Sequence, residues 1–250
     1  MTQQASIGCY GKVPCVGDFV SRRMTRSFIE PWDRWLQTAI GSSRDLLGPE
    51  WLDIYLTSPI WRFALAAGIC GEAAATGILV PSVDKVGRYF PLTLVLALPV
   101  STNPFLLLGA TSSDWFKILE TSARSLLEDS EASLEGFDRR MGEIDTAAIF
   151  KTLETGTLPT ELYRGAFHLQ IEAVDEAPKA IPLVLWQFAS IACTACSVWW
   201  TEGSERVGPC ILVCDGLPKP QGYNAMLNGD WGLNLRYGVS GHSSNGFLAD

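Results

Sequence analysis

The chain has 250 residues, of which 47% are hydrophobic, 10% aromatic and 18% charged. A chain of this size buries roughly 70–75% of its unfolded surface, so this composition excludes extended disorder and predicts a compact domain with a large core. The formal net charge is −8. Because an acidic chain without a basic stripe repels phosphate backbones and anionic lipids, we expect no nucleic-acid binding and no membrane-surface role.

The first hundred residues predict strands and helices in a clear order. Ser27 and Glu30 have the spacing of a capping box before an amphipathic helix, which Gly48 and Pro49 end. The later strands are separated by Gly-containing turns, as in an antiparallel meander. We expect a strand at 6–12, helices at 28–47 and 50–56, and strands at 61–67, 76–83 and 89–98.

The middle of the chain, residues 104–175, is acidic and mainly helical. Residues 111–176 contain 14 Asp or Glu and 6 Lys or Arg, so this part alone accounts for the net charge of −8. A solvated helical face is the simplest explanation, and docking to a basic partner is the alternative. Apolar residues recur at helical spacing, and we expect helices at 115–127, 134–141 and 146–153 and a strand at 167–173.

The last third predicts a helix and a strand hairpin. The helix covers 181–192, and strands at 196–201 and 210–214 have turn-forming glycines between them. Beyond Trp231 the content of Gly, Ser and Asn rises, which is typical of an irregular segment. The whole pattern predicts one α/β (α+β) domain over 1–231, with a central, mostly antiparallel sheet of about five strands flanked by helices, and an irregular tail over 232–250.

Two uncharged stretches, 89–113 and 180–200, are long enough to cross a bilayer. Prolines interrupt the first and polar residues the second, so each predicts a buried strand and helix, and we expect no membrane insertion. Residues 1–6 carry no secretory signal pattern. Seven cysteines, an odd number scattered through apolar segments, favour a reducing compartment. We therefore expect a cytoplasmic protein.

Four cysteines superficially suggest a zinc site, as Cys193-x-x-Cys196 followed by Cys210-x-x-x-Cys214. In a strand, the last two would lie about 13 Å apart, too far for two thiolates on one ion. We therefore expect no metal centre at these positions.

Other catalytic patterns are incomplete. The Ser243 segment resembles a nucleophile elbow but lacks the second Gly and a following His. His168 lies among apolar residues and is expected to be a partly buried strand residue. With two histidines and no phosphate-binding glycine loop, the sequence predicts neither an enzyme nor a cofactor.

Seven residues stand out as a candidate partner-docking or bracing set. The charged members lie beside Gly, Pro or aromatic residues in otherwise apolar segments, where an unpaired charge is costly. One interpretation is structural pairing of Arg62 or Arg88 with Asp18 or Asp84, and the other is a docking surface. We expect the loop 12–22 and the turn 82–88 to converge near one end of the sheet. The set comprises Lys12, Asp18, Phe19, Arg22, Arg62, Asp84 and Arg88.

Several longer segments together resemble the TagF/ImpM family of type VI secretion system accessory proteins. The strongest are GCYGKVP at 8–14, GDFV at 17–20, PWDRWL at 31–36, PIWRF at 59–63 and SVDKVGRYFPL at 82–92, with weaker matches in SVWW at 197–200 and CDGLP at 214–218. The resemblance implies a fold akin to longin or SNARE-like regulatory domains. It also implies a post-translational negative regulator that contacts a forkhead-associated scaffold protein.

Residues and resemblance together predict a non-enzymatic protein that regulates secretion by protein binding. Two alternatives stay open. The chain could be a structural component of the secretion apparatus, or a metal-dependent hydrolase or phosphatase built from Asp18, Asp84 and His168.

Overall fold

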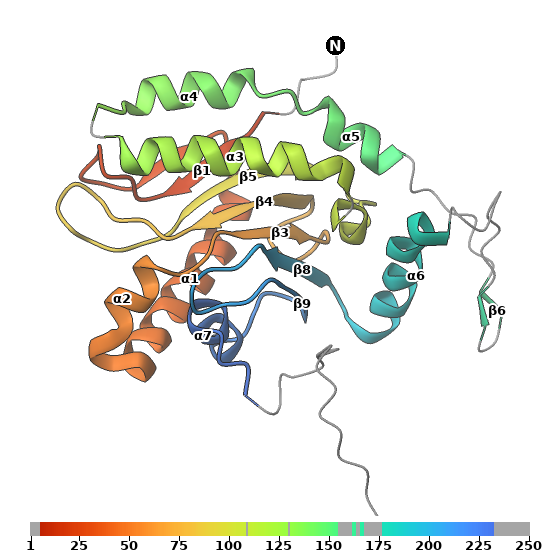
Figure 1. Cartoon of the computed structure of the whole chain (residues 1–250). Helices are drawn as coiled ribbons and strands as arrows, with labels where there is room; N and C mark the ends of the chain where they lie inside the picture. Colours follow the sequence, from red (N-terminus) through yellow and green to blue (C-terminus); the bar gives the residue numbers. More distant parts are fainter. Residues whose placement is uncertain are drawn as a thin grey trace, which may run out of the picture.

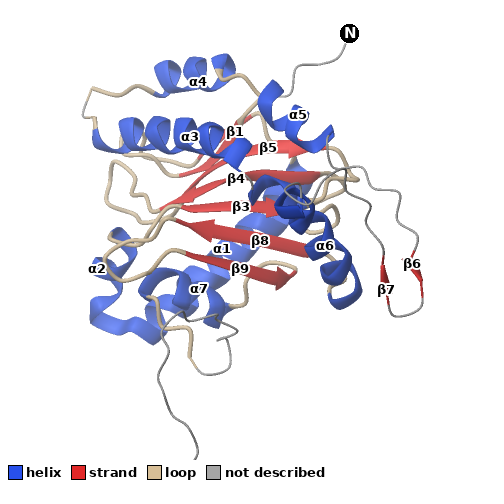
Figure 2. Ribbon diagram, turned by 45° about the vertical axis from the view of Figure 1, so that its right-hand side comes forward, coloured by secondary structure: helices blue, strands red, loops and turns tan. Residues whose placement is uncertain are grey.

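Seven strands form the main sheet of the computed structural model, in the order β2-β1-β5-β4-β3-β8-β9, and all neighbouring pairs are antiparallel. Helices cover both faces of this sheet (Figure 1; Figure 2). The expected class is therefore confirmed, and the sheet is larger than the five or so strands expected. The structure describes residues 6–108, 110–129, 131–154, 162–163, 166–167 and 177–232.

The strands of the main sheet are β1 (Gly8–Gly11), β2 (Val20–Arg22), β3 (Trp61–Leu65), β4 (Ala74–Val80), β5 (Leu92–Leu98), β8 (Cys196–Thr201) and β9 (Cys210–Asp215). A separate two-stranded ribbon consists of β6 (Leu162–Tyr163) and β7 (Ala166–Phe167). The helices are α1 (Arg26–Leu47), α2 (Trp51–Leu56), α3 (Ala110–Glu128), α4 (Leu134–Glu143), α5 (Ala147–Glu154), α6 (Ala177–Ala192) and α7 (Pro220–Asn228). Two short 3₁₀ helices are η1 (Gly48–Glu50) and η2 (Pro104–Leu108).

The central strands are buried along both faces. Every residue of β3 and β4 is buried, which explains why these strands are continuous apolar runs without alternation. Gly77 of β4 permits the close approach of β5, because a Cβ at this position would lie 1.9 Å from the carbonyl oxygen of Leu94. The centre of the sheet is therefore closely packed and offers no room for a ligand.

One face of the sheet packs on α1, α2 and α7 through an aromatic core. The indole of Trp32 is fully buried, stacks on Trp199 at 5.9 Å between ring centroids, and donates to Thr93 Oγ1 at 2.9 Å. Indole nitrogens also tie α7 to this core: Trp35 Nε1 donates to the carbonyl of Pro218 at 2.7 Å, and Trp61 Nε1 to that of Met226 at 3.0 Å. Residues from both ends of the described chain thus complete one core.

The other face packs on α3, α4 and α5 around fully buried aromatic and aliphatic residues such as Phe116, Leu119 and Phe137. A smaller cluster beneath α6 joins Ala189 to Val198 of β8. Among the described residues, no helix combines the length and the apolar composition that crossing a bilayer requires. The uncharged stretch 89–113 contains β5 and η2, and 180–200 contains most of α6 and most of β8, so each contains a strand and a helix as expected. The expected burial is wrong for α6, which exposes Ile181, Leu185 and Phe188.

The structure corrects some expected boundaries. Helix α1 begins at Arg26, and its N-cap is Thr25, whose side chain accepts from the backbone N–H of Phe28. The capping box predicted at Ser27 was therefore wrong. Strand β2 and helix α7 were not predicted. Of the strand expected at 167–173, Phe167 lies in β7, and the other positions are outside the described residues, as is the tail after 232.

Candidate partner-docking corner

The loop Lys12–Arg22 and the turn Ser82–Arg88 meet at one end of the sheet, and we call them together the corner. The hydroxyl of Ser82 donates to the carbonyl of Lys12 at 2.6 Å, and Lys85 N–H donates to the carbonyl of Val16 at 3.1 Å. The guanidinium of Arg88 donates to the carbonyl of Gly17. These three bonds join two segments about 70 residues apart in the chain into a single surface.

Asp84 lies at the centre of the corner and is 3% exposed. Its Oδ2 accepts from Lys12 Nζ at 2.8 Å and from Arg88 Nε at 2.7 Å. Its Oδ1 accepts from the backbone N–H groups of Val86 and Arg88 at 3.0 and 2.8 Å. Both carboxylate oxygens are thus paired, which offsets the cost of burying the charge.

The surroundings of Asp84 also control its protonation. Burial by itself raises the pKa of a carboxyl group, but the Lys12 ammonium and the hydrogen bonds from Arg88 and Val86 outweigh burial. They hold the pKa of Asp84 far below its ordinary value of 3.8. The residue is therefore a carboxylate at neutral pH and cannot serve there as a general acid.

Tyr55 of α2 supports the corner from below, and sequence reasoning missed it. Its hydroxyl donates to the carbonyl of Ser82 at 2.9 Å and accepts from the Ser82 N–H at the same distance. Burial raises the pKa of Tyr55 well above 10, so the hydroxyl stays neutral. The sequence predicted a short helix at 50–56 and gave no sign of this polar contact.

The outer surface of the corner presents apolar groups. Phe19 is 43% exposed, although its ring stacks on Tyr10 at 5.8 Å and meets the edge of Phe90 at 4.9 Å between centroids. Lys12 Nζ lies 5.1 Å from the centre of the Phe19 ring, within cation–π range. Val86 at the tip of the turn is 66% exposed. The Phe19 ring is therefore held in a fixed position while part of it faces solvent.

Charges around these apolar groups are mainly positive. The corner contains four cationic side chains and two carboxylates, and one of those carboxylates, Asp84, is buried. Arg22, Lys85 and Arg88 are exposed, and Asp18 is the exposed acid. Asp18 Oδ1 accepts from the Phe19 N–H at 2.7 Å, so it orders the loop. On a chain of net charge −8, the corner is a locally basic surface.

Arg62 does not belong to the corner. It is 5% exposed on β3, and its guanidinium donates to Glu120 of α3 at 2.5 Å and to Glu202, just after β8, at 2.7 Å. The pairing of Arg62 with Asp18 or Asp84, one of the expected possibilities, is therefore wrong, whereas Arg88 does pair with Asp84. The reason is that the side chain of Arg62 points toward α3. Its partner there, Glu120, lies 58 residues further along the chain, so the local sequence does not identify it.

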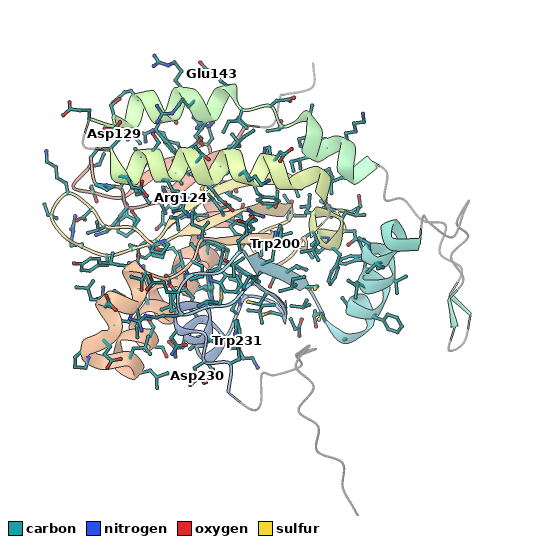
Figure 3. The ribbon with its side chains drawn as sticks, viewed as in Figure 1. Arg124, Asp129, Glu143, Trp200, Asp230 and Trp231 are labelled. Atoms are coloured by element: carbon teal, nitrogen blue, oxygen red, sulfur yellow. The ribbon has the colours of Figure 1, made fainter. Side chains whose placement is uncertain are left out.

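A cleft of about 670 Å³ borders the corner. Its lining includes Pro14, Val83, Arg124, Glu128 and Ser204, and Figure 3 shows Arg124 on α3. Asp84, which the hydrolase alternative requires, does not line the cleft. The cleft is therefore a partly apolar groove beside the corner.

The structure describes all four cysteines of the zinc-like spacing, and none of them is in a disulfide. Burial raises the pKa of Cys196 to about 12 and that of Cys214 to about 11, so both thiols stay protonated at neutral pH. No group of three or more His, Cys, Asp or Glu side chains among the described residues is arranged to hold a metal ion. His168 and Ser243 lie outside the described residues.

The family described as "TagF N-terminal domain, Type VI secretion system-associated" matches residues 8–144, which include both segments of the corner. The crystal structure of PA0076 from Pseudomonas aeruginosa PAO1 is similar over 98% of this chain and 100% of that chain, with 34% sequence identity and a TM-score of 0.72. No curated protein matches the sequence. The family match covers more than half of the chain, which therefore belongs to the TagF family of type VI secretion system-associated proteins.

Proposed function

We propose that this protein is a cytoplasmic regulator of the type VI secretion system that acts by binding a protein partner, without catalysis, through the corner. The observation that carries the proposal is that the corner separates paired, buried charges from apolar and cationic groups that face solvent. Its buried charges, Lys12 and Asp84, satisfy one another, and Phe19, Val86 and the exposed cations are left facing solvent.

Preorganisation favours binding at such a surface. Loops held by a rigid scaffold often carry binding residues. Here the loop is fixed by Ser82, Asp84 and Arg88 before any partner arrives. Less conformational entropy is then lost on association, which raises affinity for a given contact area. An aromatic ring with nearby arginines is also the composition that is enriched at interface centres.

The resemblance supports a forkhead-associated scaffold protein as the partner, and negative regulation as the outcome. The positive charge of the corner, with Arg22, Lys85 and Arg88 exposed, fits an acidic surface on that partner, because complementary charge speeds association and fixes orientation.

Two valines provide a matched test. Val86 at the corner and Val100 are both 66% exposed, and they lie beyond opposite ends of β5. We expect Val86→Glu to weaken binding of the purified scaffold protein by about tenfold or more, because it places an acid in the basic surface. Val100→Glu should bind as the unaltered protein does. Both variants should keep the melting temperature, since neither side chain is packed.

Secretion assays extend the test to cells. Overproduction of the unaltered protein or of Val100→Glu should reduce secretion, and overproduction of Val86→Glu should not. Deletion of the gene should increase secretion, whereas loss of a structural component of the apparatus should abolish it. Normal scaffold binding by a folded Val86→Glu protein would show that the corner is not the docking surface.

A further inference from the structure

The two edges of the main sheet differ in how they are protected. Strand β2, at one edge, has three residues and ends at an exposed arginine, Arg22. Short edges with charged side chains resist pairing with other strands. Strand β9, at the other edge, has six residues, and its only charged residue is Asp215 at the end. Within the described residues no strand pairs with the outer side of β9.

The hydrogen bonds between β8 and β9 identify the backbone groups on the open side. The N–H of Gly216 donates to the carbonyl of Ala195 at 2.7 Å, which continues the ladder between the two strands. Backbone groups alternate in direction along a strand, so the other even-numbered residues of β9 also point toward β8. The N–H and C=O groups of Ile211, Val213 and Asp215 therefore point outward, where a further strand can pair with them.

The side chains on both faces of this edge are apolar. On one face Ile211 is 61% exposed and Val213 is 45% exposed. On the other face Leu212 lines a pocket of about 650 Å³, together with Leu46 and Trp231. Successive side chains of an added strand point to opposite faces, so each would meet an apolar group of β9. The strand that fits this edge is therefore apolar at successive positions and carries no charge at its centre.

Strand β9 itself has that composition. We propose that β9 pairs antiparallel with β9 of a second copy of the chain, about a twofold axis at Leu212. Residues whose backbone groups point outward must lie opposite one another, so Ile211 pairs with Val213 of the second copy and Val213 with its Ile211. Leu212 lies opposite Leu212 of the second copy on the other face. The exposed apolar side chains of each copy are then covered by those of the other.

Charge and strand length select this register over its neighbours. With the axis at Leu212, Asp215 lies opposite Pro209 of the second copy, whose carbonyl can accept the N–H of Asp215. An axis at Val213 would place Asp215 opposite Ile211, a charged group against an apolar side chain. An axis at Ile211 would place Asp215 opposite Val207, which is fully buried and lies outside the strand. The axis at Leu212 avoids both conflicts.

The size of the contact sets the expected strength of the dimer. A standard interface buries about 800 Å² on each partner. Two strands of six residues share a ladder only ~20 Å long, so we expect a reversible dimer with a dissociation constant on the order of micromolar. Strand β2, which belongs to the corner, lies at the opposite edge of the sheet, so the corner stays free in each copy.

Light scattering of the full chain over a range of concentrations tests the pairing. The measured mass should rise from 27.3 kDa toward twice that value as the concentration increases. Ile211→Lys should weaken the dimer by about tenfold or more, because a charge on an edge strand opposes pairing. Ile118→Lys is the matched control, since Ile118 is 49% exposed and lies on α3, away from β9 (Figure 1). It should dimerise as the unaltered protein does, and both variants should keep the melting temperature.

Two native cysteines report the register. In the proposed pairing Cys210 lies opposite Cys214 of the second copy, where opposed Cα atoms are about 4.5 Å apart, a distance that a disulfide can span. Within one copy these two residues are about 13 Å apart along the strand and cannot bond to each other. Diamide, which accepts the two thiol hydrogens, should therefore link the copies through Cys210 and Cys214. Non-reducing gels and peptide mass spectrometry detect the link.

Serine variants of these cysteines complete the test. Cys210→Ser or Cys214→Ser alone should abolish the link, because each of the two symmetric links needs both residues. An equal mixture of the two variants should restore it. A chain that stays monomeric at every concentration, or a dimer that Ile211→Lys leaves unchanged, would overturn the proposal. A dimer linked through Cys214 of both copies, or a mixture that forms no link, would also overturn it.

Discussion

Replacement of Arg62 by methionine tests whether this residue braces the core or contributes to docking. The guanidinium joins Glu120 and Glu202 and lies 5.7 Å from the centre of the Phe116 ring. Methionine keeps most of the apolar length of the side chain and removes the charge. The Glu120 carboxylate of α3 then remains without its cation from β3.

The two carboxylates differ in exposure, and the expected cost follows from that difference. The side chain of Glu120 is 18% exposed and that of Glu202 is 70% exposed. Removing one partner of a fully buried pair costs about 3–5 kcal/mol, so for this partly hydrated pair we expect Arg62→Met to cost about 2–3 kcal/mol. Glu120→Gln should cost about 1–2 kcal/mol, and Glu202→Gln about 0–0.5 kcal/mol.

Urea unfolding at pH 7, followed by tryptophan fluorescence, measures these differences in the free energy of unfolding. Scaffold binding by Arg62→Met at a temperature where the variant is folded should equal that of the unaltered protein, because Arg62 lies away from the corner. A cost for Glu202→Gln as large as that for Glu120→Gln would refute the assignment. A loss of scaffold binding by the folded variant would return Arg62 to the docking surface.

Three further changes have expected outcomes. Gly77→Ala should lower stability by about 3 kcal/mol or more, because its Cβ would clash with the carbonyl of Leu94; Gly142→Ala, with no atom within 4 Å of the new Cβ, should be neutral or stabilising in thermal melts. The pKa of Asp84 is depressed, so its stabilisation is complete above the unfolded-state pKa near 3.8 and is lost as the pH falls toward the folded-state pKa. The stability difference between the unaltered protein and Asp84→Asn should therefore be constant from pH 7 to about 5 and shrink below about pH 4, and a difference that grows in acid would contradict the pairing. Burial raises the pKa of Cys196 to about 12, so iodoacetamide at pH 8 should alkylate it, by mass spectrometry, only after unfolding; labelling of the native protein at the rate of a free thiol would show that it is accessible.

The sequence predicted those features that depend on neighbouring residues. Helix α1 ends where Gly48 adopts a positive φ of 54°, a conformation that glycine reaches without strain. Asp84 and Arg88 are four residues apart, and their pairing was among the possibilities that the sequence raised. In both cases the determining atoms lie within one turn of the chain.

Features that depend on distant residues could not be predicted. The partners of Arg62 lie 58 and 140 residues away, and nothing in the local pattern identifies them. Helix α7 has Pro220 at its start and Gly222 within it, a weak local signal; its buried face, against α1 and α2, stabilises it. Strand β2 has three residues, too few to show an alternating pattern.

The position of β8 next to β3 affects how the chain folds during its synthesis. Leu65, the last residue of β3, precedes Cys196, the first of β8, by 131 residues (196 − 65). At ~5–20 residues per second, a ribosome needs roughly 7–26 s to make that interval. During this time the edge of β3 that will pair with β8 has no partner strand, and the indole of Trp32 lacks its contact with Trp199. Both can then associate with other unfolded chains. We therefore expect holdase chaperones to bind the nascent chain until β8, β9 and α7 emerge.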